Sequence, residues 1–119
     1  MQAEEALAVA SRNGLKWGSN AGTNMAWMYI LKCSDGTYYV GSATELAFRI
    51  REHEDGMGSR YTARRRPVEL VYSCEFASIV QAYEAENQVK GWSRAKKEAL
   101  MREDWDLLPK LSERRVKNR

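Results

Sequence analysis

The sequence predicts a small α+β domain in which helices pack on an antiparallel sheet. Short β-rich runs and helical segments follow one another in the order β-β-α-β-α-α. These helices are too few to cover a parallel sheet on both faces, so an antiparallel sheet is expected. The 119 residues, of which 44% are hydrophobic, suffice for one domain with its own core.

The first two strands are predicted to form a hairpin. β-rich runs at residues 27–33 and 38–41 flank the segment 34–37, which contains an Asp-Gly pair. Asp-Gly between two such runs is typical of a tight turn. Because side chains alternate along a strand, Tyr38 and Tyr39 are expected on opposite faces of the sheet. Only one of the two can therefore face a cleft.

A helix over about residues 45–55 is predicted to follow the hairpin. Thr44 is its expected N-cap, and Gly56 follows its last turn, where glycine often ends a helix. Three residues recur at the spacing of one helix face: Leu46, Ile50 and His53.

One strand and two helices are predicted in the second half of the chain. Pro67 marks the boundary before a strand over about residues 68–76, which is rich in Val, Leu, Tyr and Phe. Ser78 is the expected cap of a helix that ends near residue 90. Ser93 is expected to open a last helix that ends near residue 102.

The two ends of the chain are excluded from the predicted domain. Residues 1–24 contain an Ala-rich piece and a segment rich in Gly, Ser and Asn, which indicates a mobile leader. Because Met25 resembles a natural start, this leader is interpreted as an added extension as readily as a native segment. The domain is expected over residues 25–108, followed by a charged tail at 109–119. Three apolar residues near the domain's end are candidates for docking on the core: Trp105, Leu107 and Leu108.

Charge and cysteine usage narrow the class of protein. The net charge of +3 is too small to indicate a nucleic-acid binder by itself. Cys33 and Cys74 are far apart and form no CxxC pattern, so buried thiols in a reducing compartment are expected. No apolar run approaches the roughly 20 residues that span a bilayer. We therefore expect a cytoplasmic protein with no membrane partner.

Positive charge is concentrated in two acid-free runs at residues 59–66 and 90–97. Contacts with a phosphate backbone and a simple solvated face explain these runs equally well. No recognition helix is visible, so weak sequence specificity is expected. Tyr61 and Trp92 are candidates for stacking on unpaired bases, although core packing is the favoured role for Trp92. The candidate nucleic-acid-binding residues are Arg60, Arg64, Arg65, Arg66, Lys90, Arg94, Lys96 and Lys97.

Some polar residues occupy positions where a purely structural chain would place apolar ones. Glu86 lies at the edge of the inward face of its helix, where a carboxylate is costly unless it is paired or binds a metal. A salt bridge to Lys90, one turn later, explains it equally well. Arg49 and His53 also lie one turn apart, so a guanidinium and the chain's single histidine can address one target.

These residues together resemble the GIY-YIG nuclease superfamily, in particular its small stand-alone members. The likeness covers about residues 27–101. The motif halves appear as Trp27-Met28-Tyr29 and Tyr39-Val40-Gly41, followed by Arg49, His53 and Glu86. The segments 60–72 and 90–94 are also similar to the stand-alone subgroup. Each motif is weak alone, and their order and spacing make the combined signal strong.

The resemblance implies a three-stranded antiparallel sheet flanked by helices and a metal-dependent endonuclease that hydrolyses phosphodiester bonds in DNA. Carried over by position, Glu86 would hold Mg²⁺ or Mn²⁺, and Arg49 would stabilise charge on the scissile phosphate. Tyr29 and Tyr39 would orient or activate the attacking water, with His53 assisting. DNA is then the expected partner, and no small-molecule cofactor is expected.

Two further expectations follow from the resemblance. DNA repair or related DNA metabolism is the expected setting, although Ser42 stands where some repair members have a lysine. The alternative is a non-catalytic nucleic-acid-binding module that acts with a partner protein. The oligomeric state stays open.

Overall fold

The computed structural model describes residues 25–108 of the chain. The predicted leader at residues 1–24 and the charged tail at 109–119 lie outside the described residues. Within the described part, no helix is both long and apolar enough to cross a membrane. Cys33 and Cys74 are free and buried, as the sequence predicts.

Strand β1 (Ala26–Lys32) is apolar on both faces, and this decides its place in the sheet. Its first six residues are all buried, so each face of the strand has to be covered. It pairs antiparallel with β2 (Tyr38–Ala43) and with β3 (Glu69–Phe76), giving the strand order β2-β1-β3. The predicted three-stranded antiparallel sheet is confirmed, and β2 is one of its edges.

The turn between β1 and β2 is the predicted Asp-Gly turn. Gly36 has a φ of 86°, in the left-handed region that favours glycine. One carboxylate oxygen of Asp35 accepts hydrogen bonds from the Thr37 amide at 3.1 Å and from the Thr37 hydroxyl at 2.6 Å. These local contacts fix the register of the hairpin.

The helices follow the prediction with one addition. The described helices are α2 (Leu46–Glu54), α3 (Arg60–Ala63), α4 (Ile79–Lys90) and α5 (Arg94–Met101). The predicted order lacked α3, because one helical turn is too short to show a periodic pattern within a basic run. The observed order is therefore β-β-α-α-β-α-α.

The helix caps are set by single serines in most places. Ser78 and Ser93 cap α4 and α5 through their side chains, as predicted. The prediction of Thr44 as the cap of α2 is wrong, because Glu45 holds the N-cap position and makes no side-chain cap bond. Gly56, with a φ of 83°, follows the end of α2 as expected.

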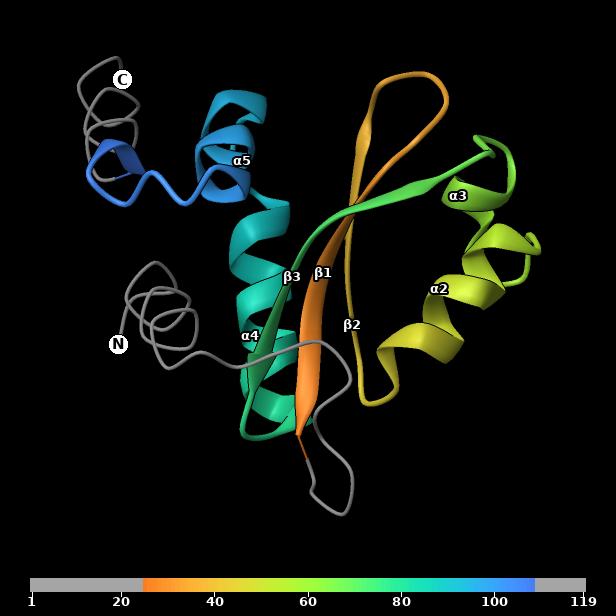
Figure 1. Ribbon diagram of the computed structural model, residues 1–119, viewed down its shortest axis with the longest axis horizontal. Coiled ribbons are helices and arrows are strands. Elements are labelled where there is room, and N and C mark those ends of the chain that lie inside the picture. Colours follow the sequence, from red (N-terminus) through yellow and green to blue (C-terminus); the bar gives the residue numbers. More distant parts are fainter. Residues whose placement is uncertain (1–24, 109–119) are drawn as a thin grey trace.

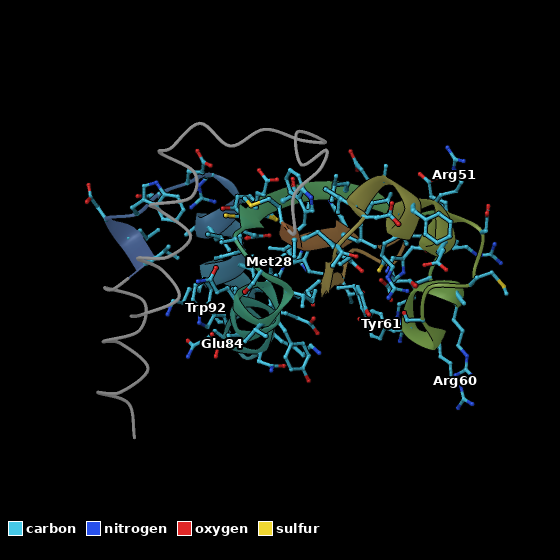
Figure 2. The ribbon with its side chains drawn as sticks, turned by 90° about the horizontal axis from the view of Figure 1, so that it is seen from below. Met28, Arg51, Arg60, Tyr61, Glu84 and Trp92 are labelled. Atoms are coloured by element: carbon cyan, nitrogen blue, oxygen red, sulfur yellow. The ribbon has the colours of Figure 1, made fainter. Side chains whose placement is uncertain are left out.

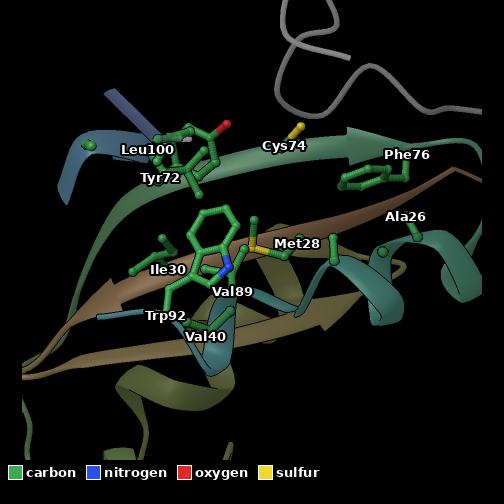
Figure 3. Packing of buried hydrophobic residues seen from close by; sticks show 14 residues of the cluster. Ala26, Met28, Ile30, Val40, Tyr72, Cys74, Phe76, Val89, Trp92 and Leu100 are labelled. Carbon is green, nitrogen blue, oxygen red and sulfur yellow. The ribbon is translucent and has the colours of Figure 1, made fainter. Parts of the chain in front are cut away.

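Helices cover both faces of the sheet, with α4 and α5 on one side and α2 and α3 on the other (Figure 1). On the α4 side, Met28 and Ile30 of β1 pack against Val89 and Trp92 (Figure 3). Trp92 is buried in this core, which confirms its packing role. The three apolar residues at the end of the domain also pack here as expected: Trp105, Leu107 and Leu108.

The face toward α2 carries a second apolar cluster, which is built around alternate residues of β1 and includes residues of β2 and α2. Its buried members are Trp27, Tyr29, Leu31, Ala43 and Leu46. Tyr39 packs against this cluster, whereas Tyr38 packs on the α4 side. The expected alternation of Tyr38 and Tyr39 is confirmed, and Tyr39 is the one beside α2.

Candidate active site

Tyr29 reaches the β2 edge because its partner on that strand is a glycine. Tyr29 and Gly41 lie directly opposite each other in the β1–β2 register. A Cβ added at Gly41 would collide with the ring and hydroxyl of Tyr29. The missing side chain therefore gives the phenol room to cross β2, and this explains why the two motif halves need a tyrosine and a glycine at these places.

His53 holds the Tyr29 hydroxyl from the α2 side. Its Nε2 lies 2.8 Å from the Tyr29 hydroxyl oxygen, and its Nδ1 lies 2.7 Å from the hydroxyl oxygen of Thr62 on α3. The ring is buried, and a Cβ added at Gly58 would collide with it. The loop between α2 and α3 thus closes directly over the imidazole.

Tyr39 completes an aromatic group on this side of β2. Its ring centroid lies 5.1 Å from that of His53 and 6.5 Å from that of Tyr29. On its other side the Tyr61 ring stacks at 6.1 Å. Tyr61 is itself covered by the Arg65 guanidinium, 3.7 Å from the ring centroid, so it supports Tyr39 rather than offering both faces to a base.

Burial and nearby charges keep the central groups uncharged. Burial raises the pKa of Tyr29 well above its usual value, with Tyr39 and Glu86 acting in the same direction and Arg49 opposing them. Burial also lowers the pKa of His53, and the positive charge of Arg49 lowers it further. At neutral pH the phenol is protonated and the imidazole is neutral.

Arg49 lies on α2, one turn before His53, and forms an ion pair with Glu52 that is open to solvent. Its Nη1 donates to Glu52 Oε1 at 3.1 Å, and both side chains are about one-third exposed. An ion pair this open to water contributes little to stability. The guanidinium can therefore exchange the carboxylate for a phosphate at a small energetic cost.

Glu86 approaches from the opposite side of the edge strand. Only 8% of the residue is exposed. The Ser42 hydroxyl donates to Glu86 Oε1 at 2.7 Å, and the Lys90 ammonium lies 2.8 Å from Oε2. The salt bridge to Lys90 that the sequence left open is thus present. It leaves the Lys90 side chain 57% exposed and able to move away.

The donor set at Glu86 fits a divalent cation with few protein ligands. The Lys90 ammonium already occupies a cation position on this buried carboxylate. A hard carboxylate oxygen beside the Ser42 hydroxyl suits Mg²⁺ or Mn²⁺, which keep most of their waters. Within the described residues there is no cluster of three or more His, Cys, Asp or Glu that could hold a metal.

The candidate residues come from four elements and lie on both faces of the edge strand β2, with Glu86 on the face toward α4 and the others on the face toward α2. Tyr29 and Tyr39 come from the hairpin, with Arg49 and His53 from α2 and Glu86 from α4. The supporting roles of Ser42 and Thr62 were not predicted from the sequence. Strand alternation with Val40 could have placed Ser42 on the α4 face, whereas no local pattern indicates the contact of Thr62 with His53.

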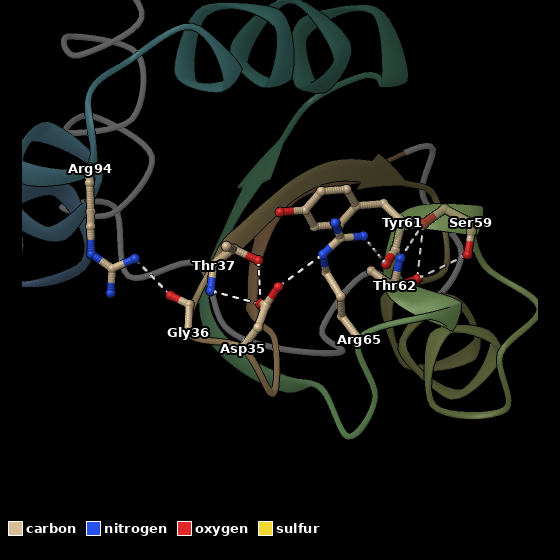
Figure 4. A network of polar contacts seen from close by, with 8 residues as sticks. All are labelled: Asp35, Gly36, Thr37, Ser59, Tyr61, Thr62, Arg65 and Arg94. Carbon is tan, nitrogen blue, oxygen red and sulfur yellow. Dashed lines mark hydrogen bonds and ion pairs between the residues drawn. The ribbon is translucent and has the colours of Figure 1, made fainter.

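Two predicted DNA-binding arginines make hydrogen bonds to the hairpin turn (Figure 4). Arg65 bonds Asp35 at 3.0 Å and the Tyr61 carbonyl at 3.1 Å. Arg94 donates to the Gly36 carbonyl at 2.7 Å and pairs with Glu98 at 3.2 Å. Both guanidinium groups are engaged in contacts within the domain.

The structure also corrects the assignment of Lys96 to the DNA-binding set. Lys96 is buried, and its ammonium lies 4.2 Å from the centroid of the Trp92 ring. A phosphate backbone cannot reach a side chain in this position. Sequence reasoning placed it in the basic run because charge alone does not reveal burial.

The remaining basic candidates lie nearer to solvent. Arg60 and Arg64 are exposed around α3, and Arg60 extends away from the ribbon (Figure 2). Arg66 donates to the carbonyls of residues 63 and 54 at 3.2 and 3.4 Å. Partial burial lowers the pKa of Lys97.

The fold and the site together define a catalytic domain of a known nuclease family. The family model described as the GIY-YIG catalytic domain matches residues 25–99, and the chain belongs to this family. The expected resemblance is confirmed.

Its relatives include proteins named UPF0213. The chain is 42% identical over 81 residues to the UPF0213 protein of Streptococcus pneumoniae, covering 68% of this chain and 82% of that protein. It is 40% identical over 81 residues to the UPF0213 protein YazA of Bacillus subtilis, with the same 68% and 82% coverage. A solution NMR structure of a UPF0213 protein from Bacillus halodurans shares 42% identity, with a TM-score of 0.43, over 64% of this chain and 81% of that one.

Proposed function

We propose that the chain is a metal-dependent endonuclease that hydrolyses phosphodiester bonds in DNA. The observation that carries this proposal is the contacting group of Tyr29, His53 and Tyr39 on one face of the edge strand β2, with Glu86 anchored on its other face and near enough to Tyr29 to raise its pKa. Phosphate chemistry needs an anchored carboxylate for a cation, a guanidinium and groups that orient water, and this edge offers each of them. Membership of a nuclease family supports the proposal. DNA repair or related DNA metabolism is the setting that we propose for it.

Glu86 is the proposed ligand of Mg²⁺ or Mn²⁺, and the Ser42 hydroxyl fixes the orientation of its carboxylate. When bound, the divalent ion supplies Lewis-acid chemistry at the scissile phosphate. The exposed Lys90 side chain can leave Glu86 and contact the DNA backbone. Arg49 exchanges Glu52 for the phosphate and neutralises charge as it develops there.

The tyrosines act as orienting groups in this proposal. Tyr29 stays protonated because burial raises its pKa, so its oxygen serves as a hydrogen-bond partner rather than as a base. Tyr39 is only partly buried and lies between the His53 and Tyr61 rings, which fix its orientation. It is the proposed partner of the attacking water.

The proposal is tested by replacing Glu86 and by a matched replacement on the same helix. Glu86→Gln is expected to abolish cleavage of labelled DNA in Mg²⁺ or Mn²⁺, because the amide lacks the charge that a divalent ion needs. Glu84→Gln is the control, since Glu84 is exposed on α4 (Figure 2). Single-stranded, duplex and branched DNA are compared, with binding measured in EDTA.

Each outcome separates the proposal from its alternative. Cleavage by wild type and Glu84→Gln, with none by Glu86→Gln, supports the nuclease. Undiminished cleavage by purified Glu86→Gln contradicts it. Binding in EDTA without cleavage by any form favours the non-catalytic module.

A second variant tests the guanidinium. Arg49→Ala is expected to slow cleavage by at least about tenfold, since a charge-assisted contact to the phosphate is lost. Arg51→Ala is the matched control, because Arg51 is exposed on the same helix (Figure 2). Equal rates for the two variants would exclude a specific role for Arg49.

A further inference from the structure

Among the described residues, the Thr62 side chain contacts the candidate active site through His53. It is fully buried, at 0% exposure, in the one-turn helix α3. Its hydroxyl oxygen lies 2.7 Å from His53 Nδ1, on the side of the ring opposite the Tyr29 contact. A hydroxyl at this nitrogen decides which ring nitrogen carries the proton, provided that its own proton is committed elsewhere.

The Thr62 hydroxyl has a second acceptor. It can donate to the carbonyl oxygen of Ser59, three residues earlier, at 3.4 Å, and its oxygen also lies 2.9 Å from the Ser59 hydroxyl. Threonine in a first helical turn often donates to a carbonyl in this way. With its proton on the Ser59 carbonyl, the Thr62 oxygen is free to accept from the imidazole.

A count of donors and acceptors distinguishes the two tautomers of His53. With the proton on Nε2, the ring would donate to the Tyr29 oxygen, and the Tyr29 proton would have no acceptor among the described residues. With the proton on Nδ1, Tyr29 donates to Nε2, the ring donates to Thr62, and Thr62 donates to Ser59. Buried donors are nearly always paired, so the second arrangement is favoured.

We propose that Thr62 is a positioning residue for the reaction. Its hydroxyl holds His53 as the Nδ1–H tautomer, so that Nε2 accepts a hydrogen bond from the Tyr29 hydroxyl. The lone pairs of the Tyr29 oxygen then stay available to a partner at the edge of β2, where the proposed function places the scissile phosphate. This inference rests on the proposed function, which places Tyr29 and His53 in the active site.

The local structure holds Thr62 rigidly in this place. The Ser59 side chain caps α3 and accepts from the Thr62 amide at 3.1 Å (Figure 4). Arg65 ties the same turn to Asp35 on the hairpin at 3.0 Å. The lack of a side chain at Gly58 lets the preceding loop close over the imidazole. The hydrogen-bond chain Tyr29–His53–Thr62 is therefore held in place at Tyr29 by the sheet and at Thr62 by the α3 turn.

The tautomer is read directly by NMR, because the chain contains a single histidine. Protein labelled with ¹⁵N-histidine and held at pH 8 is expected to show Nδ1 as the protonated nitrogen. Thr62→Val keeps the shape of the side chain and removes the acceptor, so we expect the proton to shift wholly or partly to Nε2. Thr62→Ser restores the hydroxyl and is expected to restore the wild-type spectrum.

The kinetic readout uses the same variants. Thr62→Val is expected to lower kcat on DNA by at least about tenfold and to leave KM within about twofold, because binding groups are untouched. Thr62→Ser is expected to recover most of the rate. Ser59→Ala is the control for stability, because it removes the side-chain cap of α3 and keeps the carbonyl of residue 59. We expect His53 in this variant to have the same tautomer as in wild type.

Each result bears on one proposal. A wild-type spectrum with the proton on Nε2, or an unchanged tautomer or kcat in folded Thr62→Val, overturns the role of Thr62. If Thr62→Val does not fold, the wild-type, Thr62→Ser and Ser59→Ala spectra still decide it. Cleavage by Glu86→Gln would instead contradict the proposed function, and the NMR result does not depend on activity.

Discussion

At the scale of single residues, His53 shows how burial determines the charge state of the site. The ring is enclosed by Tyr29, Tyr39 and Thr62, and no carboxylate of the described residues hydrogen-bonds to it. Desolvation therefore disfavours the imidazolium, and Arg49 disfavours it further. The folded domain keeps the imidazole neutral in a range of pH where an unfolded chain would bind a proton.

This difference predicts that the domain loses stability in mild acid. The folded pKa of His53 lies below its ordinary value near 6.5, so protons bind preferentially to the unfolded chain as the pH falls through that value. The free energy of unfolding should then decrease by up to about 1.4 kcal/mol per pH unit. Urea unfolding of wild type and His53→Gln between pH 7.5 and 5.5 measures it. Equal slopes for both proteins would contradict the prediction.

Glu75 is another buried ionisable residue, and no described residue neutralises its charge. It lies on β3 opposite Trp27, is 2% exposed, and neither carboxylate oxygen has a hydrogen-bond partner in the described structure. Burial raises its pKa. The stability that this shift contributes is present at low pH and is lost as the pH rises and the buried group ionises.

We expect Glu75→Gln to stabilise the domain at pH 8. The neutral amide avoids burying an unpaired charge, and the gain should be on the order of 1–3 kcal/mol. The gain in stability over wild type should become smaller toward pH 4, where the Glu75 carboxyl of the wild type is protonated. Denaturant unfolding at both pH values checks this, with Glu69→Gln, exposed on the same strand, as the control. A destabilised Glu75→Gln at pH 8 would count against it.

At the scale of elements, α4 links the core to the candidate site. Ala82, Ala85 and Val89 on its buried side pack on the sheet. Glu86 is also buried on this helix and lies next to the edge strand β2. The position of Glu86 therefore depends on how firmly the helix is anchored. Its first turn is held by the Ser78 side chain, which accepts from the Gln81 amide at 3.2 Å.

Removing this cap should weaken the domain measurably. Ser78→Ala leaves the Gln81 amide without its side-chain acceptor and is expected to lower the free energy of unfolding by about 1 kcal/mol. Ser78→Asp supplies another acceptor and should stay close to wild type. Urea unfolding compares the three proteins. A loss in Ser78→Asp equal to that in Ser78→Ala would show that capping is not the cause.

The turn between β1 and β2 is held in place by two arginines from other parts of the fold. Arg65, in the segment after α3, and Arg94, the first residue of α5, both bond to it, so the turn is held from both faces of the sheet. Tyr38 and Tyr39 start the strand that follows the turn. These arginines consequently fix the position of Tyr39, a role that a count of basic residues does not reveal.

At the scale of the whole molecule, the charge available to DNA is smaller than the sequence indicates. Arg65, Arg94 and Lys96 are engaged within the domain. Arg60 and Arg64 are exposed around α3, on the side of the sheet that carries His53. They are the strongest candidates for contacts to the phosphate backbone.

The double variant Arg60→Ala/Arg64→Ala is expected to weaken DNA binding evenly across sequences. Each lost phosphate contact should reduce the slope of log affinity against log salt by about 0.9 on duplex DNA, so the slope should fall by about two. Fluorescence anisotropy in EDTA between about 50 and 200 mM salt measures it. Arg102→Ala, exposed at the end of α5, is the control. An unchanged slope in the double variant would rule out these contacts.

Features that depend on short distances along the chain were predictable from the residues alone. The Asp-Gly turn, the alternation of Tyr38 and Tyr39, and the caps at Ser78 and Ser93 all follow from periods of two or about 3.6 residues and from local hydrogen bonds. The order of the motif residues also identified the family. The one-turn helix α3 and the cap of α2 lacked such a local signal.

Which polar groups contact one another depends on the packing of the whole domain. Tyr29 and His53 are 24 residues apart, and Ser42 and Glu86 are 44 apart. No local period relates such positions, because their contact depends on how α2 and α4 pack on opposite faces of the sheet. The same packing buries Lys96 and leaves Arg60 exposed, although both are basic residues in basic runs. Burial is a property of the assembled layers, and residue type alone does not contain it.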